Sequence, residues 1–159
     1  MNALQNLSDS PLEPKSILTD FKFGCINAFN NVFPNAEKRG CYFHFSQCIW
    51  KKIQKCPDIL EKYKVAEFAL HLRQLAALAF VPIPDVVSSF DTLMDTPFFQ
   101  ENDALLRPLL DYFEDTWIGR PRRRGRRKPI FEHGQWNCFL ALQMVFPART
   151  MPFKAGTIV

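Results

Sequence analysis

The sequence predicts an α+β protein that is mostly helical by residue count. Near the start, a short apolar run at 17–18 is followed by apolar residues at helical spacing and then by an extended run at 36–45. From 45 to 117, apolar residues recur at the spacing of helices, without an alternating segment typical of a strand. Hydrophobic residues make up 47% of the 159 residues and include 16 Phe, which argues against intrinsic disorder.

The first strand and helix are predicted from the start of the chain. Residues 1–14 are polar and carry prolines without periodicity, so we expect a disordered lead-in. Residues 17–18 are short enough to be only the end of a strand. Asp20 follows and opens a helix, which Pro34 ends because proline has no amide hydrogen to donate. The apolar face of this helix is formed by Phe21, Cys25, Ala28, Phe29 and Val32.

Residues 36–45 are predicted to form the second strand, which ends in C-Y-F-H-F. Alternation along a strand places Cys41, Phe43 and Phe45 on one face and Tyr42 and His44 on the other. The order strand, Asp, helix, strand places Asp20 at the carboxyl end of a strand. Open α/β sheets position their functional residues at this edge.

Residues 46–118 are predicted to form a helical bundle, because their apolar stripes are joined by short connections. Pro57, Pro97 and Gly119 mark helix ends, and the V-P-I-P run at 81–84 separates two further helices. After residue 129, one more helix is expected, and Pro147 ends it. Its apolar positions are Trp136, Phe139, Leu140 and Met144.

The loop at 119–129 contains seven cations and no acid, whereas the whole chain has a net charge of +4, so all other residues together sum to −3. The cations are Arg120, Arg122, Arg123, Arg124, Arg126, Arg127 and Lys128. Their mutual repulsion, with Pro and Gly between them, predicts that the loop does not fold on its own. It is suited to contact several phosphates of DNA, or to act as a nuclear-import sequence. A solvated loop without a partner is the alternative.

The remaining composition excludes several classes of protein. No apolar run approaches the length that crosses a bilayer, and no signal peptide opens the chain, so we expect a soluble intracellular protein without a membrane partner. The five Cys are scattered and are expected to be free thiols. Cys41 and His44 form a C-x-x-H, but no second ligand pair follows at zinc-finger spacing. A strand would separate them, and a helix beginning at His44 would pair His44 with Cys48 in at most a partial site. We therefore expect a structural role for Cys41 and His44, and no zinc.

A family resemblance rests on several segments in order. They are T-D-F, I-N-A-F, F-P-N-A and G-C-Y-F-H-F within 19–45, L-A-A-L-A-F-V-P at 75–82, D-Y-F-E-D-T-W-I-G-R at 111–120, the arginine run, W-N at 136–137 and R-T at 149–150. Together they resemble the Mutator-like element (MULE) transposase domain over roughly residues 15–150. No one segment is decisive, but their order and spacing agree with the family.

The resemblance implies a Mg²⁺-dependent nuclease core of RNase-H-like fold, which cuts and joins DNA strands through three metal-binding acids. Residues 15–45 would be part of that core, 46–118 its helical insertion, and 130–159 a C-terminal helix with a divergent tail. Asp20 matches the second acid, although from the residues alone a helix cap is the simpler role for it. The first acid would lie upstream of the chain. Arg149 and Thr150 are followed by M-P-F-K, where the family has Asn-Asn and then its final Glu.

We therefore expect a catalytically incomplete, DNA-binding fragment of a MULE transposase, located in the nucleus or otherwise in the cytoplasm. Glu114 and Asp115 are not expected to replace the missing acids, because they belong to the helical insertion. Mg²⁺ binding by the fragment alone is not expected. There are two alternatives. The first is a regulatory module without catalysis, which would bind DNA, an intact transposase or a second copy of itself. The second is an inert gene remnant.

Overall fold

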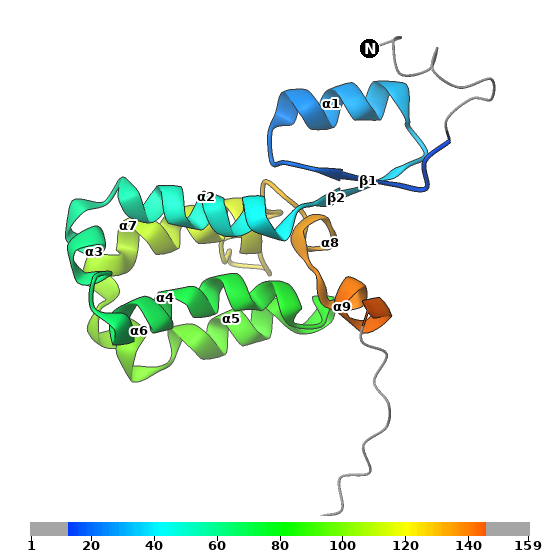
Figure 1. The fold of residues 1–159 in the computed structure, drawn as a ribbon. Coiled ribbons are helices and arrows are strands. Elements are labelled where there is room, and N and C mark those ends of the chain that lie inside the picture. The colour runs from blue at the N-terminus through cyan, green and yellow to red at the C-terminus, as the bar shows by residue number, and fades with distance from the viewer. Residues whose placement is uncertain (1–12, 146–159) are drawn as a thin grey trace, which may run out of the picture.

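The computed structural model describes residues 13–145, and its fold is mostly helical with a small parallel sheet, which confirms the predicted α+β class (Figure 1). Within these residues, no helix is long and apolar enough to cross a membrane. Most of the predicted lead-in, the predicted helix end at Pro147, and Arg149, Thr150 and the divergent tail lie outside the described residues.

The N-terminal part is a strand, a helix and a second strand. Strand β1 (Ser16–Thr19) pairs in parallel with β2 (Glu37–Gly40), from Ser16 opposite Glu37 to Thr19 opposite Gly40. Helix α1 (Phe23–Val32) connects them and contains no buried residue. The predicted face of this helix is therefore only partly correct: Phe21 precedes the helix and packs against the core, whereas Cys25 is exposed.

The predicted second strand is too long, because β2 ends at Gly40 and Tyr42 begins a helix. The amide of Cys41 donates to the carbonyl of Thr19 at 2.9 Å, continuing the pairing with β1. The carbonyl of Cys41 then accepts from the amide of Phe45, also at 2.9 Å, as the first turn of the helix forms. The predicted division of 41–45 between two strand faces is therefore wrong. A short apolar run is compatible with either a strand or a helix, and the helical conformation is the one that buries Phe45 in the core.

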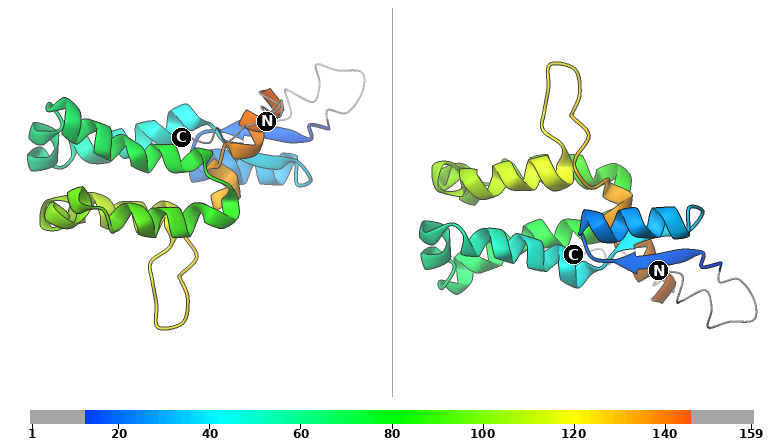
Figure 2. Two further views of the ribbon diagram at one scale, coloured as in Figure 1. Left: turned by 90° about the horizontal axis from the view of Figure 1, so that it is seen from below. Right: turned by 90° about the horizontal axis from the view of Figure 1, so that it is seen from above.

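The helical part is a two-layer bundle. Helix α2 (Tyr42–Gln54), the short α3 (Pro57–Lys62) and α4 (Ala66–Ala77) form one layer. The second contains α5 (Val86–Met94), the short α6 (Pro97–Glu101) and α7 (Asp103–Phe113), which runs into the π-helical turn η4 (Glu114–Ile118). Figure 2 shows the two layers edge-on. The short 3₁₀ turns η2 (Leu78–Phe80) and η3 (Ile83–Asp85) link α4 to α5 across the layers.

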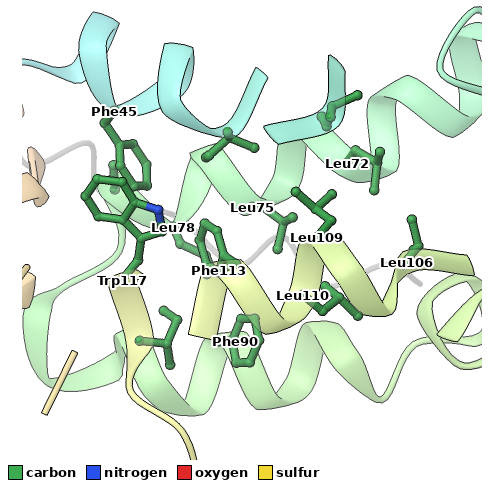
Figure 3. Packing of buried hydrophobic residues seen from close by; sticks show 14 of the residues in the cluster. Phe45, Leu72, Leu75, Leu78, Phe90, Leu106, Leu109, Leu110, Phe113 and Trp117 are labelled. Carbon is green, nitrogen blue, oxygen red and sulfur yellow. The ribbon is translucent and has the colours of Figure 1, made fainter. Parts of the chain in front are cut away.

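Aromatic side chains fill the end of the bundle nearest the sheet. The ring of Phe45 lies 4.8 Å from both Trp117 and Trp136, and Trp117 faces it from the opposite layer (Figure 3). Phe21 extends from the β1–α1 connection to within 4.8 Å of Trp117. Aromatic pairs in these edge-to-face and stacked arrangements each add about 0.5–1.5 kcal/mol beyond the burial of their surface. The sheet is thus attached to the bundle through aromatic contacts.

The predicted C-terminal helix is divided in two. Helix α8 (His133–Trp136) ends before Asn137, and α9 (Phe139–Val145) begins after Cys138. The side chain of Asn137 donates to the carbonyl of Val81 at 2.7 Å. The backbone amide of Cys138 donates to the carbonyl of Ala79, also at 2.7 Å. These long-range hydrogen bonds hold the backbone between the two helices in an extended conformation. The prediction of a single helix containing Trp136 is therefore wrong.

Candidate nucleic-acid interface

The basic loop forms a hairpin that projects from the layer of α5 and α7 (Figure 2). Pro121 pairs with Arg126 across an antiparallel bridge, and the amide of Arg122 donates to the carbonyl of Gly125 at 2.8 Å to close the turn. One step lower, the amide of Arg127 donates to the carbonyl of Arg120 at 2.8 Å. Gly125 has a φ of +73°, which favours glycine over other residues. The loop therefore has a defined structure, and its contacts with the bundle explain why.

Asp115 holds both strands at the base of the hairpin. Its Oδ1 accepts from Nε of Arg120 at 2.6 Å and from Nη2 of Arg127 at 2.5 Å. Arg120 also pairs with Asp111 at 3.3 Å. The hydrogen bond from Arg120, with the charges of Arg120 and Arg127, lowers the pKa of Asp115 below its usual value despite the opposing effect of burial. One carboxylate therefore reduces the repulsion between two neighbouring cations.

Arg126 is the most enclosed guanidinium of the hairpin, with a side chain 20% exposed. Its Nη1 donates to the carbonyl of Gly119 at 2.7 Å and lies 3.6 Å from Glu114, and its Nη2 pairs with Asp91. Its guanidinium also lies over the ring of Phe90, 5.9 Å from the centroid. Lys128 pairs with Glu132 further along. The contacts of Arg126 tie the hairpin to α5 and to η4.

The tip of the hairpin remains without such partners. Arg122, Arg123 and Arg124 are exposed, and among residues 13–145 no acid forms an ion pair with them. The structure therefore divides the seven predicted DNA-binding cations into two groups. Four form ion pairs, namely Arg120, Arg126, Arg127 and Lys128, and three extend into solvent. Glu114 and Asp115 belong to the base of the hairpin and pair with its arginines.

Asp20 lies at the carboxyl end of β1, as predicted, and its side chain is 20% exposed. Its Oδ1 accepts from the amide of Lys22 at 3.2 Å, and its Oδ2 pairs with the ammonium of Lys22 at 3.1 Å. The side-chain hydrogen bond from Lys22 is the main cause of a lowered pKa of Asp20. Asp20 does not cap α1, because that helix begins at Phe23 and its N-cap is Lys22. The helix-cap alternative is thus wrong.

Mg²⁺ requires several oxygen ligands in octahedral geometry. Over the part of the chain that the structure describes, no three His, Cys, Asp or Glu side chains converge to hold a metal ion. The other titratable groups that interact with Asp20 are Lys22, His44 and Cys48, which supply no carboxylate oxygen. The described residues around Asp20 therefore do not fit a Mg²⁺ site.

Cys41 and His44 lie at the start of α2, and both are half-buried. Cys41 is the N-cap of the helix, and Nδ1 of His44 is buried without a hydrogen-bond partner among the described residues. Cys48 lies on the same helix, and burial raises the pKa of its thiol, which disfavours the thiolate that binds metal. The contacts of Cys41 in the backbone are structural.

The comparison with protein families agrees with the motifs at the start of the chain. Residues 1–48 match the family model of the MULE transposase domain. The resemblance predicted over roughly residues 15–150 is shown for this segment, which contains Asp20 and extends into α2. No curated protein and no solved structure matches the chain. The hairpin lies outside the segment matched to the MULE model, so its function depends on its own geometry.

The acids at the base of the hairpin were not identified from the sequence as partners of the arginines. Asp111, Glu114 and Asp115 immediately precede the arginine run, so this acidic cluster could have indicated that some cations are paired within the chain. Asp91 could not have been found in this way, because it lies 35 positions before Arg126 and is brought there by the packing of α5. Sequence alone therefore overstated the free charge of the loop.

Proposed function

We propose that this chain is a transposon-derived DNA-binding protein that contacts phosphates through Arg122, Arg123 and Arg124. The observation that carries the proposal is the exposure of these three guanidinium groups, without acidic partners among the described residues, at the tip of an anchored hairpin. Guanidinium groups donate two parallel hydrogen bonds to phosphate oxygens and stay charged at neutral pH. The base of the hairpin fixes where these groups are presented.

The test is DNA binding by a variant with Arg122→Gln, Arg123→Gln and Arg124→Gln, measured by fluorescence anisotropy at increasing salt. Each phosphate contact contributes about 0.9 to the slope of log affinity against log salt, so we expect the slope to fall by about 2.7. The matched control is Lys15→Gln, Lys51→Gln and Lys55→Gln, which removes the same charge from exposed sites away from the hairpin. Unchanged affinity and slope in the arginine variant, or equal losses in the control, would refute the proposal.

We also propose that the chain alone does not cut or join DNA. Two-metal strand cleavage needs carboxylates that fix both ions, so that one activates the attacking water and the other stabilises the leaving oxygen. Asp20 supplies one carboxylate, and its oxygens already bind Lys22. Purified protein should leave supercoiled plasmid intact with Mg²⁺ or Mn²⁺. Metal-dependent nicking that is absent from an Asp20→Ala control would show that further acids complete the site.

A second candidate function is regulation of a transposase, or of another copy, through association. The observation that favours it is the exposed apolar surface around the β1–α1–β2 unit. The side chains of Leu18, Phe23 and Phe43 are 69%, 57% and 60% exposed. Within the described residues, the sheet has two strands, so each leaves one edge unpaired. Light scattering should show concentration-dependent association that decreases with Leu18→Glu and Phe23→Glu, whereas a monomer at all concentrations would exclude self-association.

A further inference from the structure

The hairpin presents its free arginines at a narrow turn. Arg122, Arg123 and Arg124 are consecutive, and the hydrogen bond from Arg122 to Gly125 places them at the point where the chain reverses. At Gly125, which follows them, a Cβ atom would have no heavy atom within 4 Å. A side chain at Gly125 would thus extend into open space, and the glycine itself places no side chain beside the arginines.

The charge of the hairpin changes sharply between its tip and its base. The tip carries three positive charges. The base contains four cations paired with five acids, which are Asp91, Asp111, Glu114, Asp115 and Glu132. The base is thus slightly negative and gains nothing by approaching phosphates. A favourable complex places the tip against DNA and keeps the base, with the acids of α5 and η4, at a distance.

This charge distribution favours the minor groove over the major groove. The minor groove is about 6 Å wide and accepts arginine side chains while the backbone that carries them stays outside. The major groove is about 12 Å wide and admits a two-stranded ribbon with its backbone, so a hairpin that read base edges there would bring its base close to the phosphates on either side. For this hairpin, such an approach would move the five acids toward like charges.

The lack of orienting partners points the same way. Bidentate recognition of guanine in the major groove needs a guanidinium held in a fixed direction. At the base, Asp115 and the carbonyl of Gly119 orient the arginines, but among residues 13–145 no acid orients those at the tip. Freely rotating guanidinium groups respond to electrostatic potential more than to base-edge geometry. In DNA that potential is most negative in the narrow minor groove of A·T-rich tracts.

We propose that Arg122, Arg123 and Arg124 insert into the minor groove of A·T-rich DNA, so that the hairpin prefers A·T-rich over G·C-rich duplexes. This inference rests on the proposed DNA binding and adds the class of DNA that is bound. Arg is better suited than Lys to this role, because a guanidinium is more weakly hydrated than an ammonium and loses less on entering the groove. Arginine at these three positions should therefore contribute more to the preference for A·T-rich DNA than lysine, which carries the same charge.

The test compares duplexes of equal length, one with an A-tract and one rich in G·C, at the same salt concentration. We expect about fivefold or greater preference for the A-tract duplex, and displacement from it by netropsin, a small molecule that occupies the minor groove. The variant Arg122→Lys, Arg123→Lys and Arg124→Lys keeps the charge, so it should keep the salt slope and lose most of the preference. The Lys15, Lys51 and Lys55 control should keep both.

The outcomes separate this inference from the proposal beneath it. Equal binding to the two duplexes that netropsin does not disturb, or a preference for the G·C-rich duplex, would overturn minor-groove insertion and leave DNA binding intact. A lysine variant with undiminished preference would overturn the role of the guanidinium groups. Absence of binding to either duplex would refute the proposed function itself.

Discussion

Replacement of Gly119 by Ala should destabilise the protein far more than the same replacement at Gly125. Gly119 is buried between η4 and the hairpin, with a φ of +95°. A Cβ atom at this position would lie 2.0 Å from the carbonyl oxygen of Arg127. Gly125 has a φ of +73°, but a Cβ atom there would meet nothing within 4 Å. Both sites thus have a positive φ, which disfavours alanine, and only Gly119 has a backbone atom within clashing distance of the added Cβ.

The magnitude follows from the two contributions. An L-residue in a left-handed conformation costs about 1–2 kcal/mol, and the unfolded chain changes equally for both variants. Gly125→Ala should therefore lose about 1–2 kcal/mol. At Gly119 the clash is with backbone, so the returning strand must move. That movement breaks the hydrogen bonds from Arg126 to Gly119 at 2.7 Å and from Phe131 to Thr116 at 2.9 Å. At about 1 kcal/mol each, these raise the loss to about 3–4 kcal/mol.

The assay is urea unfolding followed by tryptophan fluorescence, since Trp117 and Trp136 are fully buried in the folded protein. Gly125→Ala serves as the matched control for the intrinsic effect of the substitution. If the free energies of unfolding of the two variants agreed within about 0.5 kcal/mol, the close approach of Gly119 to Arg127 would be refuted as a constraint on the fold.

Three further predictions concern the core, the sheet and the ion pairs. Phe45→Ala should lower the free energy of unfolding by about 3–5 kcal/mol, and Leu18→Ala, at an exposed position, by less than about 1 kcal/mol, as measured in urea. Hydrogen exchange should be slower in α4 and α7 than in α1, because α1 buries no residue; equal protection in a monomer would contradict this. The lowered pKa of Asp115 means that its ionised carboxylate stabilises the fold above about pH 3.9, and this stabilisation is lost as the pH falls through the folded-state pKa. Asp115→Asn should therefore lower the free energy of unfolding more at pH 7 than at pH 3.

The helices of the bundle could be predicted because their apolar residues follow the helical period through to burial. Phe45, Ile49 and Ile53 recur every four residues on α2, and all three are buried. The boundaries at 41–45 and at 137–138 could not be predicted in the same way. In the first, the backbone of Cys41 bonds to Thr19 on another strand, and in the second Asn137 bonds to Val81. Both choices depend on partners distant in the sequence.

The position of the candidate interface could be predicted from the sequence, but not which of its cations are free to bind a partner. Charge density alone identifies the whole run from Arg120 to Lys128. Which of its cations are free depends on where the acids of α5, α7 and η4 lie after folding, and only the packed bundle brings Asp91 to Arg126. Asp20 was placed correctly at the end of β1, because the order of elements determines that position. Asp20 pairs with Lys22 two residues further along the chain, but a spacing of two residues is not enough to predict an ion pair.

The hairpin and the segment matched to the MULE model are joined by direct packing. Trp117, which precedes the hairpin, and Phe131, which follows it, lie 4.8 Å and 5.1 Å from the ring of Phe21. Phe21 is the residue after Asp20, so both ends of the hairpin contact the connection that leaves β1. Buried aromatic contacts of this kind resist relative movement. The free arginines are therefore presented in a fixed relation to the edge of the sheet that carries Asp20, and DNA bound at the tip would have a defined orientation with respect to that edge.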